Sequence, residues 1–298
     1  HGWLWLCHLG AQVFQVDLKS RLLPREDFEV SDLVRMQFQK DGISVLTEHE
    51  PVKMGREGDQ NYLEALHKGQ VVRIEFDRVL IAAGRKSNVE GIGLEKAGVK
   101  LNSAGAIQVN SAMQTNIRNI FACGDVAGPY QYTHMASYQA FFASINAMLS
   151  GFWRIRANHR VVPWATYVTP EVARVGVSEI EARELDICYE VTNYELSKLD
   201  RARTDGESQG FIKILTVPKK DKILGVTIVG HQAGELIGEF VLAMTHNMGL
   251  KKIIDAIHVY PTMYEANKLA ANEWRKSHLP KKYVTWAKRF FEWRRSGK

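Results

Sequence analysis

Apolar and polar residues alternate over residues 11–17, and an amphipathic stretch follows over residues 29–40. A period of two predicts a strand, whereas the longer period of the second stretch predicts a helix. From Ile43 to Ile81, short β-rich runs are separated by polar turns, which predicts a β meander. The first quarter of the chain is therefore expected to fold as a strand, a helix and a meander.

Two short apolar runs end in a glycine. Residues 79–83 lead into Gly84 and Arg85, and residues 120–123 lead into Gly124 and Asp125. Short apolar runs bounded by turn residues are typical of buried strands. Gly124 lets a ligand approach the backbone, and the Asp125 carboxylate can accept two hydrogen bonds from neighbouring hydroxyls. We therefore expect a site for a hydroxylated ligand where the second run ends.

The next segment predicts a helix. Gly128 and Pro129 break the chain, and Thr133 is a suitable N-cap for a helix that extends to Met148. A core helix with a good N-cap is an equally simple interpretation, so this segment alone indicates no function.

Beyond residue 163 the pattern changes to strands that follow one another closely. The predicted strands cover residues 172–176, 187–196, 210–217 and 223–229, and helical stretches follow Ser178 and Gly234. Consecutive strands joined by tight turns imply an antiparallel sheet with flanking helices. This part of the chain predicts an α+β domain.

Composition restricts the class of protein. At 298 residues and 45% hydrophobic content, the chain is long enough for two domains with their own cores. It has no run of eighteen apolar residues, and its start lacks the basic residues of a signal peptide, so we expect a cytoplasmic location. Cys7, Cys123 and Cys188 lie far apart and form no CxxC pair, so neither a disulfide nor a metal site is expected.

The net charge of +6 is concentrated in the tail. Residues 281–298 hold seven Lys or Arg and one Glu, which leaves equal numbers of basic and acidic residues in the rest of the chain. Nucleic-acid binding needs a basic face on a folded domain, so no nucleic-acid partner is expected. Tyr283, Trp286, Phe290 and Trp293 recur at helical spacing and predict a basic amphipathic helix. We expect its aromatic stripe to dock on the body or across a dimer, with membrane-surface contact as the alternative.

Taken together, the two glycine-ended runs resemble the two late motifs of the FAD-dependent pyridine-nucleotide disulfide oxidoreductases, and they occur in the family's order. The resemblance implies an α/β plus α+β fold. It divides the chain into a partial Rossmann-like NAD(P) domain, the C-terminal part of an FAD domain, an antiparallel-sheet dimerisation domain and the basic tail helix. These parts correspond to residues 1–77, 78–158, 159–280 and 281–298.

The resemblance also implies cofactor contacts. Asp125 and Gly124 would bind the flavin ribityl chain, and Gly84 and Arg85 belong to the same region. The backbone of Thr133, His134 and Met135 would favour negative charge on the flavin ring. Asp17 ends a predicted strand and would bind the adenosine ribose, which favours NAD over NADP. Lys19 and Arg21 favour NADP instead, and an acid at a strand end is often only a turn former.

A further motif covers residues 258–265. In disulfide reductases the matching segment carries a His before the Pro, oriented by a Glu; here Tyr260 precedes Pro261, and Glu265 matches the Glu. Because tyrosine is a poor base at neutral pH, thiol exchange is in doubt, and the resemblance shifts toward the mercuric-reductase-like branch. On an extended segment His258 would face the same side as Tyr260 and could act in its place. A homodimer with shared sites and a cis Tyr260–Pro261 bond are expected.

A Rossmann unit needs a GxGxxG loop before the strand predicted at residues 11–17. This loop is missing, because the first ten residues include only Gly2 and Gly10. The family's FAD phosphate loop and cysteine pair are not found either. We expect the intact relative to pass electrons from NAD(P)H through FAD to a disulfide, metal ion or other small acceptor, and this chain alone to be inactive. A non-catalytic dimerisation or binding module, or a flavin electron-transfer subunit completed by a second chain, are the alternatives.

Overall fold

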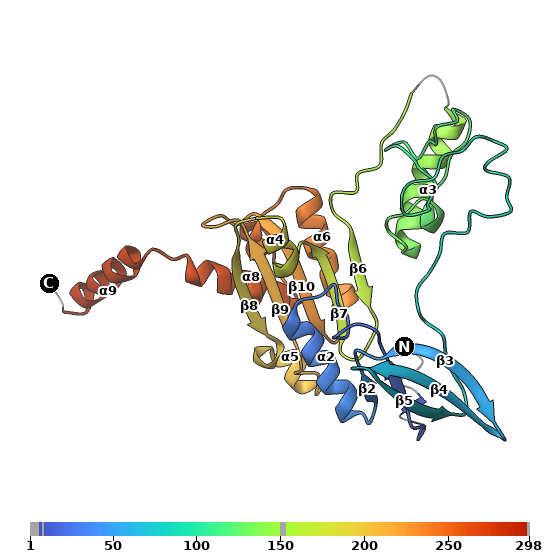
Figure 1. The fold of residues 1–298 in the computed structure, drawn as a ribbon. Helices are drawn as coiled ribbons and strands as arrows, with labels where there is room; N and C mark the ends of the chain where they lie inside the picture. The colour runs from blue at the N-terminus through green and yellow to red at the C-terminus, as the bar shows by residue number, and fades with distance from the viewer. Residues whose placement is uncertain (1–5, 8, 150–152, 297–298) are drawn as a thin grey trace. The chain divides into compact units, whose positions relative to one another are not determined.

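The computed structural model describes residues 6–7, 9–149 and 153–296, and it divides into two compact units. The first unit comprises residues 1–78 and 163–298, and the second comprises residues 79–162. Figure 1 shows the elements of both. The first five residues of the predicted NAD(P) domain lie outside the described residues.

The first unit begins with a small parallel pair of strands. β1 (Phe14–Val16) pairs with β2 (Ser44–Leu46), and α2 (Phe28–Lys40) connects them. Three longer strands follow as an antiparallel sheet: β3 (Glu50–Glu57), β4 (Gln60–His67) and β5 (Gln70–Phe76). The predicted strand, helix and meander are confirmed, with the strand shorter than expected.

The larger sheet of this unit is antiparallel and has five strands in the order β6-β7-β10-β9-β8. The strands are β6 (Pro163–Thr166), β7 (Glu171–Gly176), β8 (Glu190–Glu195), β9 (Phe211–Thr216) and β10 (Ile223–Gly230). Its helices are α4 (Glu179–Glu184), α5 (Asp200–Thr204), α6 (Ala233–Thr245), α7 (Leu250–Asp255) and α8 (Glu265–Ser277), with a short 3-10 turn, η2, over Leu196–Lys198. The α+β prediction for this part is confirmed.

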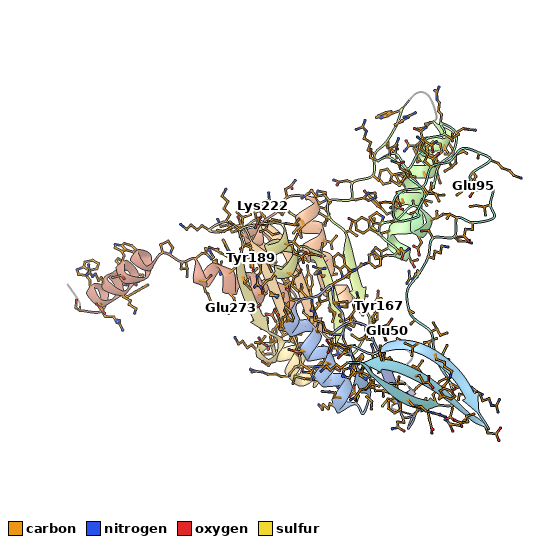
Figure 2. The ribbon with its side chains drawn as sticks, in the orientation of Figure 1. Glu50, Glu95, Tyr167, Tyr189, Lys222 and Glu273 are labelled. Carbon is orange, nitrogen blue, oxygen red and sulfur yellow. The ribbon has the colours of Figure 1, made fainter. Side chains whose placement is uncertain are left out.

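Helices cover this sheet. α6 contacts β7 and β10, while α8, whose Glu273 is labelled in Figure 2, contacts β8 and β9. α2 adds Val30, Val34 and Phe38 to a core that also includes strand residues of the sheet. Residues from the first part of the chain, around α2, and from the large sheet therefore share one hydrophobic core.

The second unit contains little regular structure. Its elements are a 3-10 turn, η1 (Gly124–Val126), and α3 (Thr133–Met148), together with the isolated bridges Leu101↔Ile107 and Gln114↔Phe121. Small apolar clusters hold it together, one built on Val89, Val99 and Ile107 and another on Met113 and Ala143.

Two strand predictions in this unit are wrong. Residues 79–83 form no strand and are exposed, with Ile81 at 68%. Residues 120–123 form a single bridge, through Phe121; Ala122 is buried, and the other three residues are partly buried. A strand requires a neighbour for its backbone N–H and C=O groups, and among the described residues none pairs with residues 79–83.

The predicted helix is present, but its N-cap differs. Tyr132 is the N-cap residue, and Thr133 is the first residue inside α3. The buried side of α3 consists of Met135, Gln139, Ala143 and Asn146, while Phe141 and Met148 are exposed. The helix therefore presents apolar side chains to solvent and uses two amides in its packed face.

The tail forms α9 (Lys281–Arg295), as predicted. Its expected docking on the body is not found, because Trp286 is 66% and Trp293 57% exposed. The side chain of Tyr283, which belongs to the predicted stripe, lies outside the described residues. No helix among the described residues is both long and apolar enough to cross a membrane.

Candidate functional site

Asp125 lies in η1, where its side chain is about half exposed. Its Oδ2 is 3.4 Å from Arg85 Nη1, and Ser87 Oγ donates a hydrogen bond to its backbone carbonyl at 3.1 Å. Arg85 Nη1 also donates to the carbonyl of Gln131 at 2.8 Å. These contacts bring the two glycine-ended runs of the sequence together. An exposed carboxylate in this position can accept hydrogen bonds from a ligand.

Gly124 has a structural requirement that the sequence did not reveal. Its φ of +75° favours glycine, and a β-carbon there would lie 3.0 Å from the β-carbon of Ala136 on α3. Its backbone N–H donates to Gln139 Oε1 at 2.7 Å in a buried hydrogen bond. Gly124 thus fixes η1 against α3, whether or not it also contacts a ligand.

The N-terminal turn of α3 follows closely. Thr133, His134 and Met135 are its first three residues, and Met135 is buried. The first turn of a helix carries partial positive charge on its backbone N–H groups. The second unit therefore combines a half-exposed carboxylate, which accepts hydrogen bonds, with a helix N-terminus, whose N–H groups donate them. This combination suits a ligand with both hydroxyls and an electron-rich edge. Gly84, which directly precedes Arg85, has a φ of +122°, a backbone conformation that favours glycine.

Asp17 lies directly after β1 and forms a turn. Its Oδ1 accepts the backbone N–H of Lys19 at 2.8 Å, and its backbone carbonyl accepts that of His49 at 3.1 Å. Arg21, in contrast, is bound to the carbonyls of Pro24 and Glu26 and lies 4.4 Å over the Phe28 ring. Arg21 therefore has a structural role here.

His258 and Tyr260 do not face the same side, contrary to the prediction. The His258 side chain is buried, with Nε2 3.1 Å from Glu239 Oε1 on α6, and its ring stacks on Tyr264 at 4.6 Å. Asn267 donates to the second oxygen of Glu239 at 3.0 Å. Tyr260 is 63% exposed, because the chain bends at Tyr260 and Pro261. The Tyr260–Pro261 bond is cis, as expected.

The Tyr260 hydroxyl donates to Asp200 Oδ2 at 3.2 Å. This hydrogen bond, with the nearby negative charge, raises the pKa of Tyr260 above 10.0. Glu265 is partly buried and its backbone N–H contacts Thr262 Oγ1 at 3.3 Å. Burial, assisted by the charge of Glu265, raises the pKa of Tyr194 to about 12. Both phenols therefore remain protonated at neutral pH.

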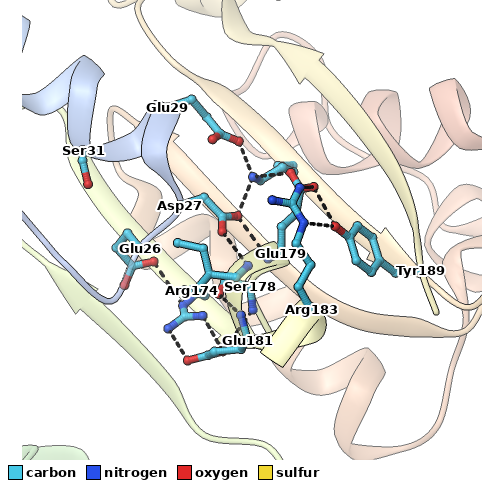
Figure 3. Close-up of polar contacts among 12 residues, drawn as sticks. Glu26, Asp27, Glu29, Ser31, Arg174, Ser178, Glu179, Glu181, Arg183 and Tyr189 are labelled. Carbon is cyan, nitrogen blue, oxygen red and sulfur yellow. Dashed lines mark hydrogen bonds and ion pairs between the residues drawn. The ribbon is translucent and has the colours of Figure 1, made fainter. Parts of the chain in front are cut away.

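A buried ionic network in the first unit went unnoticed at the level of sequence (Figure 3). Lys213 Nζ lies 2.5 Å from Asp27 Oδ2 and 3.0 Å from Glu179 Oε1, and it also contacts Glu29. The three carboxylate oxygens lie within 4.8 Å of one another, a spacing that could hold a metal ion. The ammonium group of Lys213 already lies against all three and offsets one of their negative charges.

Arg174 forms the second half of this network. Its Nη1 and Nη2 lie 2.6 and 3.0 Å from the two oxygens of Glu181, and its Nε lies 3.1 Å from Glu26 Oε2. The guanidinium also covers the Trp164 ring at 4.3 Å. Burial raises the pKa of Glu26, although Arg174 opposes this shift. Lys213 and Arg174 thus fasten the start of α2 to the sheet.

The order of the strands explains why these two cations lie together. Thr227 of β10 is opposite Arg174 of β7 on one side and opposite Lys213 of β9 on the other. Residues directly opposite in neighbouring strands project from the same face of a sheet. No periodicity in the sequence indicates this pairing, because both cations lie in runs that are otherwise apolar.

Comparison with known families identifies the chain. It belongs to the pyridine nucleotide-disulphide oxidoreductase family, whose model matches residues 4–140. The model described as the dimerisation domain of the same family matches residues 162–271.

Among curated relatives, the dihydrolipoyl dehydrogenase of Thermus scotoductus is 36% identical over 274 residues, covering 91% of this chain and 58% of that enzyme. The dihydrolipoyl dehydrogenase of Mycobacterium leprae is 32% identical, covering 88% of this chain and 56% of the relative. The chain therefore spans somewhat more than half the length of these relatives.

Solved structures show the same fold. The HOCl-induced flavoprotein disulfide reductase RclA from Escherichia coli superposes with a TM-score of 0.81 at 24% identity, covering 91% of this chain and 61% of that one. LpdA from Mycobacterium tuberculosis gives a TM-score of 0.81 at 23% identity, covering 90% and 57%.

Proposed function

We propose that this chain is part of a cytoplasmic FAD-dependent oxidoreductase that passes electrons from NAD(P)H to a disulfide, a metal ion or another small acceptor. The observation that carries this proposal is the half-exposed Asp125 carboxylate, 3.4 Å from Arg85, within residues 4–140, which match the family's model. FAD, when bound, supplies the chemistry of hydride acceptance and electron transfer.

The residues of the second unit have separate roles in this proposal. Asp125 accepts hydrogen bonds from the ribityl hydroxyls, and Arg85 holds the carboxylate in place. The first turn of α3, with Thr133, His134 and Met135, presents its positive end to the electron-rich edge of the flavin ring. Asp17 would bind a ribose hydroxyl of the nicotinamide nucleotide through the carboxylate oxygen that Lys19 does not use.

The first unit supplies a twofold interface. Ile257 and Val259 are strongly exposed on the segment that leads to Tyr260, and exposed apolar side chains of this kind favour a subunit contact. A homodimer through residues 159–280 would present the segment from Tyr260 to Glu265 to the flavin of the partner subunit.

Tyr260 is proposed to position the acceptor. The hydrogen bond to Asp200 raises the pKa of Tyr260, so the phenol stays protonated at neutral pH. It can donate a hydrogen bond but does not act as a base. Glu265 would assist from the first turn of α8. His258, held by Glu239 and Asn267, supports this segment from its buried side.

A chimera tests the proposal. The part of the Thermus scotoductus enzyme that this chain does not match would be joined to it, and the flavin absorbance and oligomeric state of the purified protein measured. We expect a yellow dimer that oxidises NADH. A colourless dimer would favour the alternative of a non-catalytic dimerisation module. The first unit supports this alternative, because it has a hydrophobic core of its own.

In the same chimera, Tyr260→Phe separates a role in acceptor binding from a role in packing. We expect slower turnover of the acceptor, with flavin reduction by NADH and the dimer unchanged. Asp200→Asn should cause a smaller loss, because Tyr260 keeps its hydroxyl. Unchanged kinetics in both variants would reject the role of Tyr260.

A further inference from the structure

α9 carries a continuous aromatic surface that the proposed function does not use. The Trp286 and Phe290 rings stack at 5.6 Å, and Phe290 lies 5.6 Å from Phe291 and 6.0 Å from Trp293. All four side chains are exposed. Trp286, Phe290 and Trp293 follow the i, i+4, i+7 spacing of one helix face.

The opposite face of α9 is basic. Lys288 and Arg295 project away from the aromatic stripe, and Arg289 and Arg294 lie at its two margins, while Glu292 is the one acidic residue in residues 281–298. In the part of the chain that the structure describes, Lys288, Arg289 and Arg294 form no ion pair. The positive charge of the tail therefore has no partner among these residues.

We propose that α9 binds the surface of a bilayer that contains anionic phospholipid. A helix with an aromatic face and a Lys- and Arg-rich face lies in the plane of a membrane interface, with its rings between headgroups and acyl chains. Basic side chains near such a surface each contribute about 1 kcal/mol. Long Lys and Arg side chains also reach the headgroups while their stems cover apolar surface.

The charge of α9 favours this partner over a second copy of the helix. Two copies packed through their aromatic stripes would bring two strongly positive segments together, and like charges in proximity repel. An anionic membrane surface removes the same repulsion. The neutral charge balance of residues 1–280 means that the tail alone would direct the protein to such a surface.

Vesicle flotation of the whole chain tests the proposal. We compare vesicles of phosphatidylcholine alone with vesicles in which about one third of the lipid is phosphatidylglycerol. We expect flotation with the anionic vesicles, release at high salt, and a blue shift of tryptophan emission.

Two variants test the aromatic face and the basic face of α9 separately. Trp286→Ser should lower the partition coefficient about 10- to 150-fold, because burial of an aromatic ring contributes about 1.5–3 kcal/mol. The double variant Lys288→Glu, Arg295→Glu, on the opposite face, should lower binding to anionic vesicles by about tenfold or more. Trp153→Ser is the matched control, since Trp153 is similarly exposed but lies outside α9. Binding of this variant should equal that of the unmodified chain.

Four results would overturn the proposal. These are the absence of flotation, equal binding to both kinds of vesicle, a change of oligomeric state in Trp286→Ser, and binding of a single-stranded oligonucleotide that outcompetes the vesicles. The third result would place the stripe in a subunit interface, and the fourth would assign it to nucleic acid.

Discussion

β9 and residues 79–83 are both short and rich in apolar residues, yet the molecule uses them in opposite ways. All six residues of β9 are buried, and the strand lies between β10 and β8. Residues 79–83 are exposed and pair with no described strand. An apolar run thus predicts a strand only where the chain also supplies the neighbours that its backbone needs. The first unit has completed its core, whereas the second presents apolar surface that needs a covering layer.

The largest expected effect concerns the ionic network that completes the first unit. Lys213→Met should lower the free energy of unfolding by about 3–5 kcal/mol, because it leaves the carboxylates of Asp27, Glu29 and Glu179 close together without a cation. Urea unfolding followed by tryptophan fluorescence measures the change. Lys222→Met replaces an exposed lysine and should change stability by less than about 0.5 kcal/mol. Equal effects would show that the network does not hold α2 to the sheet.

The next prediction compares the two apolar runs directly. Ile212→Ala in β9 should cost about 2–5 kcal/mol, since Ile212 is fully buried and its truncation leaves a cavity. Ile81→Ala should cost less than about 0.5 kcal/mol in this chain, because its side chain is already in water. A large loss in Ile81→Ala would mean that the two regions do not differ.

Asp125→Ala tests the second unit as a binding surface. In the chimera, FAD binding should weaken by about 1.5–3 kcal/mol, the value of a hydrogen bond to a charged group. Asp59→Ala, which removes an exposed carboxylate from the turn between β3 and β4, is the control. Titration of the apoprotein with FAD gives both affinities, and equal affinities would remove Asp125 from the flavin site.

The smallest effect is a difference in acid sensitivity. Burial acts to raise the pKa of Asp27, but the hydrogen bond and charge of Lys213 outweigh it and hold that pKa below 3.8. A lowered pKa stabilises the fold above the unfolded value, and this contribution is lost as the pH falls through the folded value. Asp27→Asn should therefore be less stable at neutral pH and lose less stability than the unmodified chain below pH 3.8. Parallel pH profiles would contradict the assignment.

The local patterns of the sequence predicted most of the regular elements. Alternation and amphipathicity are properties of neighbouring residues, so α2, the meander and the strands of the large sheet could be predicted from local patterns. The run at residues 79–83 failed because strand formation depends on a partner elsewhere.

The contacts of the candidate site could not be predicted from the sequence. Asp200 and Tyr260 are 60 residues apart, and Lys213 and Glu29 are 184 apart, so neither contact leaves a local signal. The burial of His258 was missed for a related reason, since Glu239 comes from another helix. The dimerisation domain, in contrast, was expected from the resemblance to the family, and the family's dimerisation model matches residues 162–271.

The difference between the two regions can be measured most directly by hydrogen–deuterium exchange of this chain and of the chimera. We predict strong protection of β7, β9 and β10 in both proteins, with rapid exchange of residues 79–83 in this chain and protection of the same residues in the chimera. Protection of residues 79–83 in this chain alone, or their continued rapid exchange in the chimera, would contradict the account.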